Sequence, residues 1–165
     1  MGCPAILALA RTFWGSMTSD LVTSLISVSR KTFPAAKNQE AVSDILLVSR
    51  ERNKLLQVTG ALFSASKTFA QFIEGPKLAI DQLMESITRD TRHRDVKVVS
   101  VKNEVPRKFP DWAMAYCGDE YYMDRHISRL FEALPEGLFK EQLGQLEALM
   151  VDFGKKASAD PARGS

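Results

Sequence analysis

The sequence predicts an α+β fold in which two helices pack on one face of a sheet, and three observations support this. Segments rich in β-branched residues alternate with segments that repeat apolar residues at helical spacing. Two of the strand-like segments follow one another across a short polar turn, which is typical of a hairpin. Gly75 and Pro76 end the second of them, and Pro76 suits the first turn of a helix.

The first strand is expected at residues 21–29, and the first helix is expected to follow Asn38. Residues 21–29 read LVTSLISVS, without Gly or Pro. Asn38 is a residue type that caps helices. The stripe that follows it at helical spacing begins with apolar residues and consists of Val42, Ile45, Leu46, Ser49 and Asn53.

The hairpin comprises residues 58–63 and 68–73, and a second helix follows it. The second helix is indicated by a repeat at spacings of 3, 4 and 7, formed by Ile80, Leu83, Met84 and Ile87. Residues 95–101 and 111–117 are the last two predicted strands, and Pro110 suits the start of a strand. The order β-α-β-β-α-β with one added strand is the ferredoxin-like pattern.

The chain is expected to form one domain with extensions at both ends. Residues 1–19 are predicted to be a disordered leader, 20–118 the core, 119–153 a helical cap and 154–165 a disordered tail. A short helix near residues 121–133 precedes the main helix of the cap. The apolar stripe of that main helix consists of Phe139, Leu143, Leu146, Met150 and Phe153.

Composition argues against several classes of protein. Lys plus Arg is 22 and Asp plus Glu is 20, so the net charge of +2 gives no reason to expect nucleic acid as a partner. No apolar run reaches the roughly 18 residues that span a membrane. Cys3 and Cys117 lie too far apart in sequence to suggest a disulfide framework or a metal site. Arg11 follows the apolar run at residues 4–10, whereas a secretion signal begins with basic residues, so we expect a cytoplasmic protein.

Two side-chain amides are candidates for contacts with a ligand. Gln71 alternates with Phe69 and Ile73 on one strand face, so its amide is expected to be partly buried and to need hydrogen bonds. Its partner is either neighbouring backbone, water or a ligand. Asn53 is either a helix C-cap or a second amide for the same ligand. Together the two amides could bond the edge of a heteroaromatic ring such as a flavin.

Two further groups have both a structural and a functional interpretation. The cluster of Asp90, Arg92, His93 and Arg94 is either a solvated loop or a site for a ribityl chain and phosphate, because guanidinium groups bind phosphate oxygens in pairs. The second group alternates along the last strand and either fills the core or borders a ring-shaped ligand. It consists of Trp112, Met114 and Tyr116.

Three separated stretches resemble the BLUF family, whose members sense blue light using FAD. The stretches are DILLVSRERNKLLQVTGALFSASKTFAQFIEGP at residues 44–76, RDTRHRDV at 89–96 and FPDWAMAY at 109–116. They follow one another in the family's order and at compatible distances. The resemblance covers about residues 21–117.

The resemblance implies a role for individual residues. Gln71 matches the glutamine that bonds the flavin and rearranges on excitation, and Asn53 matches a flavin-bonding asparagine. Trp112 and Met114 match a pair whose strand relays the signal. Ile45 and Ile87 match positions on the two helices that sandwich the ring. The residues that match the loop holding the ribityl and phosphate part are Asp90, Arg92 and His93. Arg52 lies beside the flavin asparagine and departs from the usual Asn or His there.

Ser27 is the main departure from the family. In LISVS it occupies the place where the resemblance implies a tyrosine in the first strand. The family's phenol gives an electron and a proton to the excited flavin, and a serine hydroxyl is far harder to oxidise. We therefore predict flavin binding with an impaired photocycle. Trp112 and Tyr116 are chemically able to donate electrons and would allow slow photoreduction.

The expected function is that of a blue-light sensor module and not of an enzyme. The expected cofactor is FAD, with FMN and riboflavin as alternatives. The module would signal to an unidentified effector protein within a homo-oligomer, without nucleic acid or membrane as partners. Two alternatives are a light-insensitive flavoprotein with a redox or regulatory binding role, and a small acylphosphatase-like hydrolase. This chain has no convincing phosphate loop between its first strand and helix, which argues against the hydrolase.

Overall fold

The computed structural model describes residues 21–110, 113–118 and 140–159 of the 165-residue chain. Its elements are β1 (Leu21–Lys31), η1 (Ala35–Lys37), α2 (Asn38–Leu55), β2 (Thr59–Ser64), β3 (Thr68–Gly75), α3 (Lys77–Arg89), β4 (His93–Pro106), β5 (Ala115–Cys117) and α6 (Lys140–Ala159). The strands form one sheet in the order β4-β1-β3-β2-β5, in which only the β2–β5 pair is parallel. The predicted α+β fold with a ferredoxin-like order and an added strand is confirmed.

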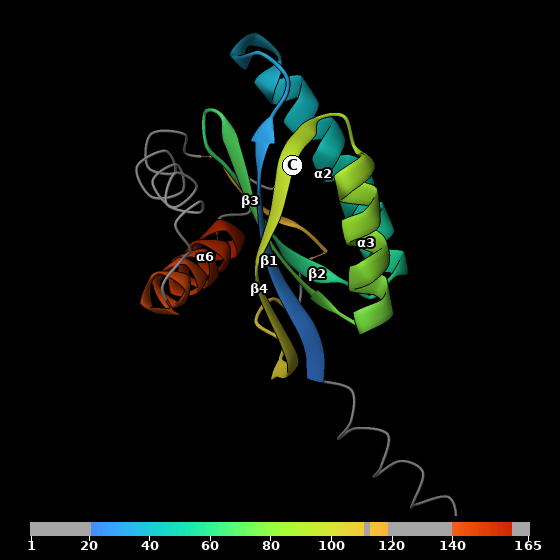
Figure 1. Cartoon of the computed structure of the whole chain (residues 1–165), viewed down its shortest axis with the longest axis vertical. Coiled ribbons are helices and arrows are strands. Elements are labelled where there is room, and N and C mark those ends of the chain that lie inside the picture. The colour runs from blue at the N-terminus through green and yellow to red at the C-terminus, as the bar shows by residue number, and fades with distance from the viewer. Residues whose placement is uncertain (1–20, 111–112, 119–139, 160–165) are drawn as a thin grey trace, which may run out of the picture.

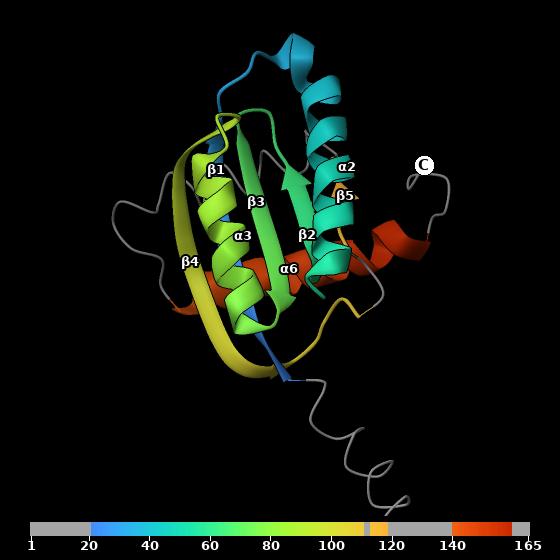
Figure 2. The same cartoon turned by 90° about the vertical axis from the view of Figure 1, so that its right-hand side faces the viewer.

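The sheet has a helical layer on each face. Helices α2 and α3 lie side by side on one face, and α6 crosses the other (Figures 1 and 2). Alternate residues of β3 divide between two hydrophobic cores: Phe69 and Ile73 pack beneath α2 and α3, whereas Ala70 and Phe72 pack toward α6. The described helices include none that is long and apolar enough to cross a membrane.

Several boundaries differ from the prediction. β4 runs from His93 to Pro106, well beyond residues 95–101, whereas β5 is limited to Ala115–Cys117. Helix α6 continues to Ala159, past residue 153, because lysine and alanine are good helix formers. The predicted leader, the short helix near 121–133 and residues 160–165 lie outside the described residues.

The prediction that Asn38 caps the first helix is wrong. The N-cap of α2 is Lys37, and Asn38 is the first helical residue. The Oδ1 atom of Asn38 instead accepts a hydrogen bond from the ammonium group of Lys31 at 2.7 Å, and Ser64 accepts a second at 2.8 Å. Lys31 is buried, and a buried ammonium group requires oxygen partners. The requirement of the Lys31 ammonium group for oxygen acceptors therefore determines the orientation of the Asn38 side chain.

A buried carboxylate fixes the turn that follows β4. Glu74 of β3 has no exposed surface and accepts hydrogen bonds from the backbone N–H groups of Lys108 at 2.9 Å and Phe109 at 2.6 Å. The hydroxyl of Thr59 donates a third bond at 3.3 Å, and Arg107 donates to that hydroxyl at 2.7 Å. Bonds between carboxylate and backbone N–H are among the strong ones. Glu74 thereby positions the chain that leads into residues 113–117.

Helix α6 is held to the sheet by charge as well as by apolar packing. Leu146 and Met150 fill the core beneath it, and the neighbouring Glu147 forms salt bridges with Lys102 of β4 and with Lys108. Burial alone would raise the pKa of Glu147, but the hydrogen bonds from the two lysines outweigh it and lower that pKa. The carboxylate therefore stays ionised and links α6 to both lysines.

Replacement of Glu147 by glutamine is expected to loosen α6. The amide keeps the size of the side chain but loses its attraction for both lysines, which should lower the free energy of unfolding by roughly 1–2 kcal/mol. Urea unfolding measures the loss, and amide hydrogen exchange locates it in α6. Glu141→Gln is the control, because Glu141 is exposed on the same helix. Equal effects of the two substitutions would contradict this role for Glu147.

Candidate functional site

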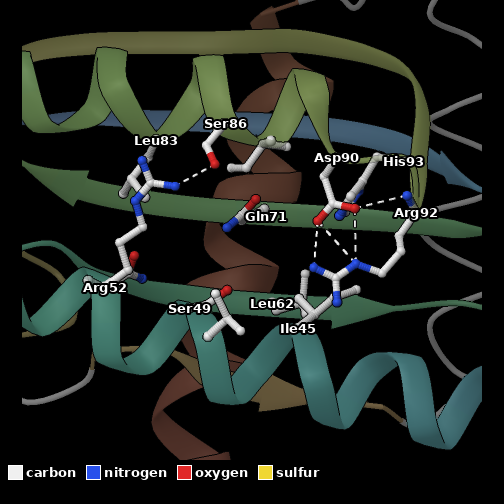
Figure 3. Close-up of a pocket in the computed structure, with 13 residues that line it drawn as sticks. Ile45, Ser49, Arg52, Leu62, Gln71, Leu83, Ser86, Asp90, Arg92 and His93 are labelled. Carbon is white, nitrogen blue, oxygen red and sulfur yellow. Dashed lines mark hydrogen bonds and ion pairs between the residues drawn. The ribbon is translucent and has the colours of Figure 1, made fainter.

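A pocket lies between α2, α3 and the sheet, with Gln71 of β3 between the two helices (Figure 3). Its lining consists of Ile45, Val48, Ser49, Arg52, Asn53, Leu62, Gln71, Leu83, Ser86, Ile87, Asp90, Arg92 and His93. The two helices supply most of these side chains, because their repeats at spacings of three and four turn one face of each helix toward the pocket.

The pocket brings together the eight residues that the family resemblance assigns to cofactor binding. These residues are Ile45, Arg52, Asn53, Gln71, Ile87, Asp90, Arg92 and His93. Five other lining residues are not predicted from the sequence as site residues: Val48, Ser49, Leu62, Leu83 and Ser86. Four of them lie on α2 or α3, three or four residues from a predicted site residue, so helical spacing was the signal that could have found them.

Gln71 offers an amide that suits a polar ligand edge. Its side chain points into the pocket and is only 8% exposed. Within the described part of the chain, that amide makes no hydrogen bond. The amide atoms stay accessible from the pocket, so a ligand or water with donors and acceptors could bond them there. The carbonyl groups and ring nitrogens of a flavin match both ends of this amide.

Asn53 connects the pocket wall to the chain that enters β5. Its side chain is buried, and its Nδ2 atom donates a hydrogen bond to the carbonyl of Ala113 at 2.7 Å. Arg50, one turn earlier on α2, donates to the carbonyl of Met114 at 3.2 Å. The C-cap of α2 is Leu56, so the interpretation of Asn53 as a helix cap is wrong. A movement of this part of α2 would therefore be transmitted to residue 113 through Asn53 and to residue 114 through Arg50.

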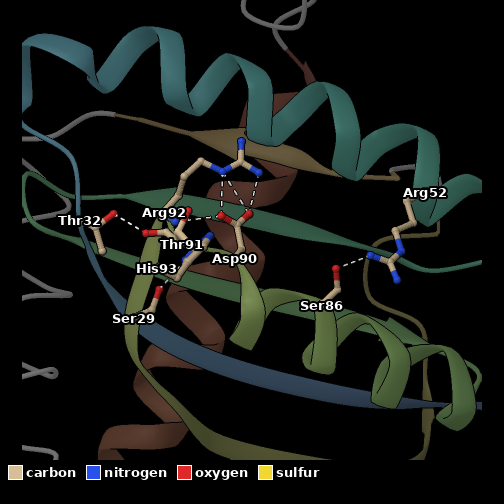
Figure 4. Close-up of polar contacts among 8 residues, drawn as sticks. All are labelled: Ser29, Thr32, Arg52, Ser86, Asp90, Thr91, Arg92 and His93. Carbon is tan, nitrogen blue, oxygen red and sulfur yellow. Dashed lines mark hydrogen bonds and ion pairs between the residues drawn. The ribbon is translucent and has the colours of Figure 1, made fainter.

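One end of the pocket carries a tight ion pair between Asp90 and Arg92 (Figure 4). The Nη2 atom of Arg92 donates to Asp90 at 2.6 Å, and its backbone N–H donates at 2.9 Å. Burial would raise the pKa of Asp90, but these hydrogen bonds outweigh it and hold that pKa below its usual value. The pair is therefore ionised and largely neutralises itself.

His93 lies beside this ion pair and is uncharged at neutral pH. Its Nδ1 atom shares a hydrogen bond with the hydroxyl of Ser29 at 2.9 Å, and its ring centroid lies 5.1 Å from that of Phe69. Burial is the main cause that lowers the pKa of His93; Asp90 opposes this shift and Arg92 adds to it. Arg94, the fourth member of the predicted cluster, is exposed and does not line the pocket.

The Asp90–Arg92 pair predicts a pH dependence of stability. The pKa of Asp90 is lower in the folded protein than its usual 3.8, so its contribution to stability is complete above that pH. That contribution is lost as the pH falls through the folded-state pKa. We therefore expect Asp90→Asn to lower the thermal midpoint at pH 7 and to match the unsubstituted protein at strongly acidic pH. Asp81→Asn, on the exposed face of α3, is the control. A difference independent of pH would contradict the prediction.

Ser27 lies on β1 directly opposite Gln71 of β3. It is buried but does not line the pocket. Ser29, two residues further, belongs to the same strand face. The sequence of β1, LVTSLISVSRK, contains no aromatic residue. No residue of this strand can therefore act as a phenolic donor.

Two of the three residues singled out on the last predicted strand, Met114 and Tyr116, lie within the described part of the chain. Met114 is buried in the core beneath α2 and α3 and does not line the pocket. Tyr116 packs against the same core from β5, so the two share a face, as predicted. Trp112 lies outside the described residues.

Comparison with known proteins identifies the family to which this chain belongs. Residues 22–115 match the family described as sensors of blue light using FAD. A photoactivated adenylate cyclase subunit beta from Euglena longa is 33% identical over 107 residues, which are 64% of this chain but 12% of that protein. The chain thus spans about an eighth of this curated relative.

Solved structures show the same fold. The dark-state structure of BlrB, a BLUF protein, superimposes with a TM-score of 0.66 at 28% identity, covering 81% of this chain and 97% of that one. The ground state of BlsA gives a TM-score of 0.67 at 22% identity, covering 79% and 87%. From the extent of the family match, this chain belongs to the BLUF family of flavin-binding blue-light sensor domains.

Proposed function

We propose that the pocket between α2 and α3 binds FAD and that the light-driven switch of this sensor domain is impaired. The observation that carries the proposal is the combination of a Gln71 amide that bonds no other lining residue in Figure 3 with a β1 strand that has no phenol. When bound, the flavin would supply absorption of blue light and a ring that accepts an electron. The family match favours this sensor over both the light-insensitive flavoprotein and the hydrolase.

Different lining residues are proposed to contact different parts of the cofactor. Ile45 of α2 and Ile87 of α3 face the pocket from opposite helices, which suits contact with the two faces of a flat ring. The amides of Gln71 and Asn53 would bond its polar edge. The remaining proposed contacts, to the ribityl chain and the phosphate, come from the end of α3 and the start of β4: Asp90, Arg92 and His93.

The choice among flavins depends on how much of the cofactor the protein contacts. Arg92 is already neutralised by Asp90, so a terminal phosphate should add little affinity. The structure of BlrP1 from Klebsiella pneumoniae, 26% identical to this chain, holds FMN. We therefore expect FAD, FMN and riboflavin to bind with affinities within about tenfold of one another, a difference of about 1.4 kcal/mol.

Fluorescence titration of the flavin-free protein tests the cofactor and its place together. Ile87→Trp should fill the pocket and abolish binding of all three flavins. Leu78→Trp introduces the same side chain on the exposed face of α3 and should leave binding unchanged. Undiminished binding by Ile87→Trp would place the cofactor elsewhere.

The output is proposed to pass from Asn53 through residues 113–117 to α6. Asn53 bonds the carbonyl of Ala113, β5 follows immediately, and the described part of α6 packs against the core that includes Ala115. We propose that α6 signals to an unidentified effector protein, within a homo-oligomer in the cytoplasm, where flavin is available. Cyclase activity is part of the name of the Euglena longa relative and is not proposed for this chain.

A further inference from the structure

The pocket lining carries one positive charge in excess. Three of its residues are ionised at neutral pH: Arg52, Asp90 and Arg92. Asp90 and Arg92 neutralise each other at a distance of 2.6 Å, and the lowered pKa of His93 keeps that imidazole uncharged. Arg52 is therefore the source of the excess charge.

Arg52 lies away from the Asp90–Arg92 pair, where its guanidinium reaches across from α2 to the hydroxyl of Ser86 on α3 (Figures 3 and 4). Within the described ranges it forms no salt bridge. Glu85, the residue next to Ser86, is paired with Arg89 instead. Asp44 of α2 acts on Arg92. Ser86 thus holds a half-buried cation beside the pocket without neutralising it.

A cation beside the pocket favours a ligand that carries more negative charge, because opposite charges attract more strongly near a protein surface than in bulk water. Reduction changes the charge of a flavin in this way. The oxidised ring takes up two electrons from an external reductant and one proton from water, and the product carries one additional negative charge. Charged groups near the ring are an established means of tuning such cofactors.

We infer that Arg52 makes this pocket bind the fully reduced, anionic flavin more tightly than it otherwise would, relative to the oxidised flavin. The inference rests on the proposed function, because it requires a flavin in this pocket. It does not depend on the orientation of the ring, since Arg52 supplies the net charge of the whole lining. Ser86 is a positioning residue, because it acts only through Arg52.

The test is the midpoint potential of the FAD-loaded full chain, measured by anaerobic titration with dithionite against a reference dye. Arg52→Gln should lower the preference for reduced flavin about tenfold, which is about 30 mV for a two-electron couple. Arg52→Lys keeps the charge and should retain most of the preference. Lys54→Gln removes the same charge from the exposed side of α2 and should change nothing. Ser86→Ala should give a smaller shift in the direction of Arg52→Gln.

Two results would overturn the inference while leaving the proposed function intact: equal potentials for Arg52→Gln and Lys54→Gln, or an equal loss for Arg52→Lys and Arg52→Gln. The second would mean that the shape of arginine matters and its charge does not. Thermal melting of each flavin-free variant verifies that it is folded. If the unsubstituted chain takes up neither oxidised nor reduced FAD, the proposed function fails, and the inference fails with it.

Discussion

A tyrosine introduced at Ser27 is expected to give the flavin-loaded protein a reversible, light-induced red shift in its absorption. Ser27 lies opposite Gln71 in the β1–β3 pairing, and the Gln71 amide is not committed to another described residue. A phenol at this place could give an electron and a proton to the excited flavin, after which Gln71 could exchange its hydrogen bonds. The larger side chain should cost about 1–3 kcal/mol of stability, because Ser27 is buried.

Two controls separate the chemistry from the position. Ser27→Phe fills the same space without a hydroxyl and should give no red shift. Ser29→Tyr places the phenol on the same strand face, but at the residue that bonds His93. A red shift in Ser29→Tyr and none in Ser27→Tyr would show that Ser29, and not Ser27, occupies the photoactive position.

The largest loss of stability is expected for Glu74→Ala. The substitution leaves the backbone N–H groups of the half-buried Lys108 and the buried Phe109 without their acceptor, and it removes one of the partners of Thr59. Each unsatisfied buried group costs about 1–3 kcal/mol, so the free energy of unfolding should fall by at least about 3 kcal/mol. Chemical unfolding measures this directly.

Glu85→Ala is the matched control, because Glu85 is exposed and paired with Arg89 on the surface of α3. Its effect should stay within about 0.5 kcal/mol. Similar losses for the two substitutions would refute the anchoring role of Glu74. The expected second effect of Glu74→Ala is faster amide exchange at residues 113–118, which this anchor precedes.

The sequence predicted the fold well where apolar periodicity was strong. The hairpin of β2 and β3 and the helices α2 and α3 have apolar faces that are buried in the structure, so their patterns were informative. β4 is an edge strand that is exposed along much of its length, so little burial pattern indicated its true ends. The lining residues on α2 and α3 were predictable for the same reason as the helices themselves.

Long-range polar contacts were beyond prediction. The bonds of Glu74 to the backbone of Lys108 and Phe109 join residues more than thirty positions apart, and no local pattern indicates such a pairing. The bond from Asn53 to the carbonyl of Ala113 is similar, since only the fold brings α2 beside residue 113. The Arg52–Ser86 contact depends on the packing of α2 against α3.

The most direct test of the account is the visible absorption spectrum of the flavin-loaded protein, recorded in the dark and again after blue light. The account predicts an oxidised flavin band that bleaches slowly or stays unchanged in the light, because β1 carries no phenol. A reversible red shift would contradict it and show that the switch operates without a tyrosine in β1.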